Sequence, residues 1–150
     1  MSLKENIATA TKEAMRARDS ARVTTLRMLS AAIQQLEIDN QKPLTDEQTL
    51  SVIEKQVKQL RESSAIYEQA GRQEQAASDL AEIEVLLTFL PKQADDAEID
   101  TVIEQTLADL GAQGVQGPAL MGRAMGALKQ ALAGRADMGQ VSARVKARLG

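Results

Sequence analysis

"VTTLRMLSAAIQQLEI" (residues 23–38) has the spacing of an amphipathic helix. Its large apolar side chains recur every three or four positions, which places them on one side of an α-helix: Val23, Leu26, Leu29, Ile33 and Leu36. No stretch of useful length alternates apolar and polar residues with the two-residue period of a strand. The sequence therefore predicts an all-α fold.

The same spacing continues on both sides of this stretch. Further helices are predicted at about Ser2–Ala17, after Thr45, between "AGRQ" (70–73) and Pro91, after Asp95, at Pro118–Gly134, and from about Gln140. Thr45 with Gln48, and Asp95 with Glu98, have the spacing of capping boxes. Gly111 is expected to end the fifth helix, and Leu80 to lie on the buried side of the fourth.

Composition suits one ordinary domain or two small helical units, because 43% of the 150 residues are hydrophobic. The stretch "PKQADDAE" (91–98) resembles a linker, so we expect the boundary between the two units to lie there. We expect an N-terminal helical subdomain of about four helices at 1–93, followed by a small three-helix bundle at 94–150.

The chain has neither cysteine nor histidine, which removes disulfides, thiolate metal sites and the commonest general base. No cofactor and no metal site is therefore predicted. The charged N-terminus lacks the apolar core of a signal peptide, and no apolar run approaches the roughly 18 residues that span a bilayer. We expect a soluble cytoplasmic protein without membrane contact.

Catalytic residues are not predicted either. Glu82 and Glu84 are two positions apart, so they do not face each other on a helix, and a solvated acidic face is expected. Ser63 and Ser64 lie mid-helix near Lys58, outside the kind of turn that exposes a nucleophile. They are interpreted as surface serines.

Charge is distributed unevenly along the chain. Residues 37–117 hold seventeen carboxylates and six cations, whereas residues 118–150 hold six cations and only Asp137 as an acid. Such asymmetry predicts either an end that faces a polyanion or two surfaces that attract each other.

The cations of the C-terminal segment are the candidate nucleic-acid contacts, because Arg and Lys supply the sequence-independent part of that affinity. Helix-dipole compensation near a C-terminus explains some of the last three without a partner. It does not explain Arg123, which we place in the first turn of the sixth helix. The predicted set is Arg123, Lys129, Arg135, Arg144, Lys146 and Arg148.

Gly122 and Gly126 are four apart in the same predicted helix and create a strip without side chains. Close packing against the fifth or seventh helix is one explanation, and we slightly favour it. Approach of a sugar–phosphate backbone between Arg123 and Lys129 is the other. With one Tyr, one Phe and no Trp, base stacking is not expected, so the RNA would be structured and recognised by shape. DNA is not an expected partner.

"MGRAMGALKQALAGRAD" (121–137) resembles the closing motif of the GatB/YqeY family. The segments at 23–38, 44–63 and 82–93, and "AGR" at 70–72, resemble its other blocks in the same order. The resemblance covers nearly the whole chain and implies two helical subdomains. It also implies a relation to the tail domain of the amidotransferase B subunit, which is thought to hold tRNA.

The resemblance brings the label of a carbon–nitrogen ligase with glutamine as amido-N-donor. That label belongs to the full enzyme, whose kinase-like cradle and ammonia-producing subunit have no counterpart here. Leu60 departs from an expected basic residue and Met138 from an expected glycine. Positions that match the family are Arg27, Lys58, Gly122, Gly126, Gly134, Arg135 and Asp137. Arg27 and Lys58 are candidates for a second patch.

Our first hypothesis is a non-catalytic accessory module that binds tRNA by shape and phosphate contacts. The alternative is a helical protein–protein adaptor whose basic end docks on an acidic partner, which includes the acidic segment of a second copy in a homodimer. An independent glutamine-dependent amide transferase is the third hypothesis.

Overall fold

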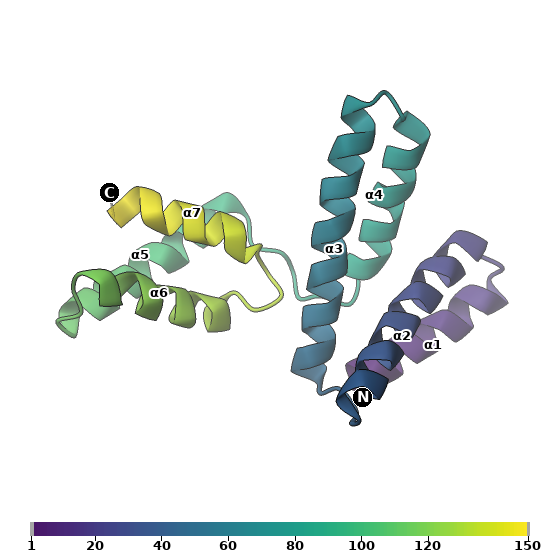
Figure 1. Cartoon of the computed structure of the whole chain (residues 1–150), viewed down its shortest axis with the longest axis horizontal. Helices are drawn as coiled ribbons and strands as arrows, with labels where there is room; N and C mark the ends of the chain where they lie inside the picture. Colours follow the sequence, from purple (N-terminus) through teal and green to yellow (C-terminus); the bar gives the residue numbers. More distant parts are fainter. Residues whose placement is uncertain (1, 150) are drawn as a thin grey trace. The chain divides into compact units, whose positions relative to one another are not determined.

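The computed structural model describes residues 2–149, and these residues form helices without any strand (Figure 1). The all-α prediction is confirmed. The helices are α1 (Leu3–Arg16), α2 (Ser20–Asn40), α3 (Asp46–Gln69), α4 (Gln73–Leu87), α5 (Asp96–Ala112), α6 (Pro118–Ala131) and α7 (Met138–Leu149). Among the described residues, none of these helices combines the length and the hydropathy that a membrane span requires.

The chain divides into two compact units, which we call the N-terminal unit (ending at Pro91) and the C-terminal unit (beginning at Lys92). Each unit has a hydrophobic core of its own. Because apolar burial is the main driving force of folding, each unit contains its own source of stability.

The N-terminal unit is built from two helical hairpins, α1–α2 and α3–α4 (Figure 1). Ser2 with Glu5, and Thr45 with Gln48, form capping boxes at the starts of α1 and α3, the second as predicted. The unit's two aromatic residues are both partly buried: Tyr67 lies on α3, and Phe89 packs against the core. That core contains Ile7, Leu29, Ile33, Leu44, Val52, Ile53, Val57, Ile83 and Leu86.

The C-terminal unit packs α6 and α7 against α5. Its α6 begins with Pro118 as predicted, since the fixed φ of proline suits the first helical position. The core is made of branched apolar side chains from all three helices: Ile99, Ile103, Leu128, Leu132, Val141 and Val145.

Three sequence predictions in the helices are wrong. Gly111 lies inside α5, and Gly114, with φ +81°, takes the left-handed position after the helix. Only a positive φ makes glycine a strong stop, and the sequence offers both glycines within one turn. Leu36 and Leu80, expected on buried stripes, are 39% and 46% exposed.

Candidate nucleic-acid interface

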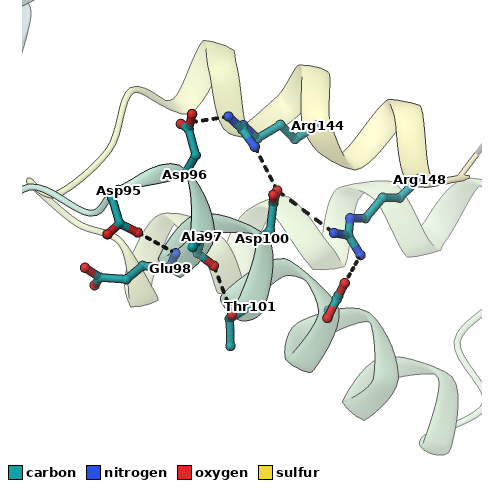
Figure 2. Close-up of polar contacts among 9 residues, drawn as sticks. Asp95, Asp96, Ala97, Glu98, Asp100, Thr101, Arg144 and Arg148 are labelled. Carbon is teal, nitrogen blue, oxygen red and sulfur yellow. Dashed lines mark hydrogen bonds and ion pairs between the residues drawn. The ribbon is translucent and has the colours of Figure 1, made fainter.

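Two of the predicted RNA-binding arginines are paired with carboxylates inside the C-terminal unit. Arg144 contacts Asp96 and Asp100, each at 2.8 Å, and Arg148 contacts Glu104 at 2.6 Å (Figure 2). Arg148 also lies 4.0 Å from Asp100. We call these five residues the α5–α7 ladder.

The ladder directs the charge of Arg144 towards α5. Its hydrogen bond with Asp100, helped by the charges of Asp96 and Asp100, raises the pKa of the Arg144 guanidinium, although partial burial opposes the shift. A guanidinium held by two carboxylates is less available to a phosphate, because the phosphate must first displace them. The two mutually attracting surfaces that the charge distribution suggested therefore exist within this unit.

Arg135 is a third predicted contact that serves the fold. Its Nη2 donates to Glu98 at 2.6 Å, and its Nε donates to the Lys92 carbonyl at 2.8 Å. Glu98, expected to complete a capping box with Asp95, is used for this ion pair, while Asp95 accepts from the Glu98 N–H as predicted. Arg135 thus joins the α6–α7 turn to the start of the C-terminal unit.

The neighbouring residues of the "GRAD" motif (134–137) support the same turn. Gly134 is buried with φ +71°, and its carbonyl accepts from Gln93 Nε2 at 2.7 Å. Asp137 Oδ1 accepts from the Gly139 N–H at 3.1 Å, which places a carboxylate at the start of α7. Local geometry therefore accounts for three of the residues that match the family.

The remaining predicted cations are accessible. Arg123, Lys129 and Lys146 are exposed and form no ion pair within residues 2–149. The dipole argument for Arg123 is wrong, because Arg123 is the sixth residue of α6 and the dipole effect fades beyond the first turn. Arg123 remains a candidate phosphate contact because its side chain is exposed and forms no ion pair with a carboxylate of the described residues.

Gly122 and Gly126 are exposed, and a Cβ added to either would meet nothing within 4 Å. The favoured explanation of close packing against α5 or α7 is therefore wrong. Helical spacing places the two glycines between Arg123 and Lys129 on the solvent side of α6. We call these four residues the exposed α6 face.

The second predicted patch consists of two exposed cations on different helices of the N-terminal unit. Arg27 on α2 lies with Nη2 3.6 Å from Met15 Sδ, and Lys58 lies on α3. Neither forms an ion pair among the described residues. No hydrogen bond or ion pair within residues 2–149 joins the two cations to a common partner.

The serines considered as nucleophiles have structural partners. Ser63 donates to Asp79 at 2.6 Å, and Ser64 donates to the Arg61 carbonyl at 3.0 Å. Their interpretation as surface serines is wrong, because Ser64 is buried and Ser63 is half-buried. Glu84 is exposed as expected, but Glu82 is half-buried rather than part of a solvated face. Within residues 2–149, no group of three or more acidic side chains is arranged to hold a metal ion.

The family model described as Yqey-like protein matches residues 4–149. This chain belongs to the YqeY-like protein family. It is also similar to a protein of the yeast Vanderwaltozyma polyspora, named altered inheritance of mitochondria protein 41, mitochondrial. The two are 33% identical over 102 residues, or 66% of this chain and 55% of the yeast protein. The chain thus spans about half the length of that relative.

Sequence reasoning missed the acidic partners in this YqeY-like protein. Asp96, Asp100 and Glu104 recur every fourth residue on α5, and Arg144 and Arg148 do so on α7. Residues four apart share one helix face, so two helices with complementary fourfold spacing are candidates for an ionic contact. That signal was present in the sequence.

Proposed function

We propose that this YqeY-like protein is a non-catalytic accessory module that binds a structured RNA, in particular tRNA, through the exposed α6 face. One observation supports this most directly: Arg123 and Lys129 flank a strip without side chains and have no carboxylate partner among the described residues. A phosphate backbone could approach the helix closely there and meet a cation on each side.

Lys146 on α7 is a further candidate for phosphate contact. It is exposed and unpaired among the described residues, whereas Arg144 and Arg148 on the same helix are held by α5. The proposal therefore uses Arg123, Lys129 and Lys146 for phosphate contact and assigns Arg135, Arg144 and Arg148 to stability. The resemblance to amidotransferase tail domains supports tRNA as the class of RNA.

Salt dependence of tRNA binding tests the proposal. Affinity for total tRNA is measured by fluorescence anisotropy over a range of salt concentrations. It is measured for the unmodified protein and for Arg123→Ala/Lys129→Ala. Removing one phosphate-binding cation lowers the slope of log affinity against log salt by about 1, so the double variant is expected to lower it by about 2.

Lys12→Ala/Lys55→Ala is the matched control, because it removes the same charge from two exposed lysines of the N-terminal unit that form no ion pair within residues 2–149. It should leave the slope nearly unchanged. No binding at low salt, affinity that is independent of salt, or equal reductions in both variants would contradict the proposal. Arg135→Ala is unsuitable, since it also breaks the contacts to Glu98 and Lys92.

The ligase label provides a separate test of the non-catalytic part. Purified protein is expected to give no amide transfer from glutamine to aminoacylated tRNA, because the proposed interface holds only phosphate-binding groups and backbone. Turnover above that of a boiled sample would contradict this.

A protein–protein adaptor is the second candidate, and exposed apolar side chains favour it. Met28, Ile38 and Ile66 are 57%, 62% and 66% exposed in the N-terminal unit, and such residues contribute to protein interfaces when they gather into a patch. Affinity capture with and without RNase distinguishes the two candidates. Partners that survive RNase support the adaptor, and partners released by RNase support RNA binding.

A further inference from the structure

A cavity of about 260 Å³ opens between α2, α3 and α4 in the N-terminal unit. Met28, Leu60 and Leu86 supply apolar walls, while Gln56 and Gln59 supply amide groups. All of its lining residues come from the segments 23–38, 44–63 and 82–93, which carry the family resemblance. Those three separate segments therefore converge on one concave site.

Glu82 is the only charged residue that lines the cavity among the described residues. Burial, and secondarily the nearby charge of Asp79, raises the pKa of the Glu82 carboxyl. Asp79 accepts a hydrogen bond of 2.6 Å from Ser63, another lining residue. Neither carboxylate forms an ion pair within residues 2–149, so negative charge at the cavity lacks an internal counter-charge there.

We propose that this cavity binds an alkylammonium group, whose aliphatic stem packs against Leu60 and Leu86 and whose charge pairs with Glu82. The walls match both parts of such a ligand, because the stem needs apolar surface and the ammonium needs acceptors. The Gln56 and Gln59 side-chain carbonyls offer additional acceptors. The proposal concerns the N-terminal unit and is independent of RNA binding at the exposed α6 face.

Size and charge disfavour other ligand classes. The cavity volume of about 260 Å³ lies below the roughly 300–1,000 Å³ of pockets for drug-sized ligands, so it suits a small group better than a nucleotide. An anion would be repelled by Glu82 in the wall and by the nearby charge of Asp79, and an uncharged alkyl group would leave Glu82 unpaired. A short aliphatic chain with one cationic end is the class that satisfies all three conditions.

Full-length protein labelled with ¹⁵N and in its methyl groups is titrated with butylammonium and, separately, with butanol. Butylammonium is expected to give saturable chemical-shift changes at Met28, Leu60 and Leu86. Butanol, which has the same stem without the charge, is expected to bind at least about tenfold more weakly, given the strength of a charged hydrogen bond. Absence of saturation, or equal affinity for both compounds, would overturn the proposal.

Glu82→Gln keeps the size of the side chain and removes its charge, so it is expected to weaken butylammonium binding by about tenfold. Glu84→Gln is the matched control, since Glu84 is exposed on the same helix and does not line the cavity. Equal effects of the two variants would overturn the proposal. The comparison of amine with alcohol needs no variant and stands if Glu82→Gln alters folding.

The ammonium group could belong to a free aliphatic amine or to a lysine side chain. Titration with 1,4-diaminobutane and with lysine capped at both ends of its backbone distinguishes these sources. Tighter binding of the diamine assigns the cavity to free amines, and tighter binding of capped lysine assigns it to peptides. Failure of both to saturate would overturn the proposal.

Discussion

Gly122 and Gly126 lie on the solvent side of α6, where a methyl group would meet no neighbour. Glycine in a helix interior costs stability relative to alanine because it loses more backbone freedom on folding. The contacts within the described structure do not offset this cost. A ligand that approaches the helix backbone would benefit from the absence of side chains at these two positions. The glycines would then lower stability and favour binding, a trade-off between stability and function that is common at binding sites.

Gly122→Ala and Gly126→Ala are therefore each expected to raise the free energy of unfolding by about 0.5–1 kcal/mol, measured by urea denaturation. The same changes should weaken tRNA binding. Gly117→Ala is the opposite control: its φ of +66° belongs to a region that only glycine adopts readily, so alanine should cost about 1–3 kcal/mol. A decrease in stability in either α6 variant would show that the face is covered.

The partial burial of Glu82 could not be predicted from the sequence. Its spacing from Glu84 excluded a shared helix face, and that inference is correct for the two residues. Whether α2 and α3 cover either carboxyl is decided by tertiary packing, which the local pattern does not contain. The cavity was therefore absent from the sequence predictions.

At the scale of elements, the helices were largely predictable because their signals are local. Apolar periodicity and caps such as Thr45 with Gln48 act within a few residues. The ion pairs of α7 are different, since Arg144 and Asp100 are 44 residues apart. The sequence identified the cations of the C-terminal unit, but only the packing of α5 against α7 determines which of them are paired.

The α5–α7 ladder should contribute modestly to stability. A double-mutant cycle with Arg144→Ala and Asp100→Ala is expected to give a small favourable coupling, as is typical of a solvent-exposed pair. The coupling should fall in high salt because screening weakens it. Replacing Arg144→Ala by Lys146→Ala in the cycle should give a coupling near zero, and a similar value for both would contradict the assignment.

Glu37 connects α1, α2 and the segment before α3. Its Oε2 accepts from Lys4 Nζ at 2.6 Å and from the Leu44 N–H at 2.8 Å. The hydrogen bond from Lys4, followed by that from Leu44, lowers the pKa of the Glu37 carboxyl from its ordinary value, and burial opposes this. A lowered folded-state pKa adds stability above the unfolded-state pKa, and this stability is lost as pH falls through the folded-state value.

Glu37→Gln is therefore expected to destabilise the protein at neutral pH. The difference from the unmodified protein should shrink progressively as the pH falls through the ordinary pKa of a glutamate and then through the lowered pKa of Glu37. Urea denaturation at several pH values measures this. Glu5→Gln is an unsuitable control because Glu5 belongs to a capping box, whereas Glu84→Gln removes an exposed carboxylate from α4 and is the matched control. A constant difference across pH would contradict the assignment.

At the scale of the whole molecule, part of the charge asymmetry of the sequence is neutralised by ion pairs inside the C-terminal unit. Glu98 and the ladder carboxylates belong to the acidic segment, and their arginine partners belong to the basic one. Counting charges along the chain therefore overstated the surface available to a polyanion. The proposed interface contains three of the six predicted cations.

Each unit has its own core, so we expect residues 92–150 to fold when expressed alone. Circular dichroism should show a helical spectrum with a cooperative thermal transition. Its midpoint should be modest, since a unit of this size buries a smaller fraction of its surface than a larger domain. A coil spectrum, or melting without cooperativity, would show that stability depends on the N-terminal unit.

Tyr67 and Phe89 both belong to the N-terminal unit, and the sequence has no other aromatic residue. Ultraviolet fluorescence consequently originates in one half of the chain, and unfolding of α5–α7 would leave the phenol emission largely unaltered. An optical melt followed through Tyr67 and a far-ultraviolet melt would diverge if the halves lose structure at different temperatures. A tryptophan placed on α7 would give the C-terminal unit a fluorophore of its own.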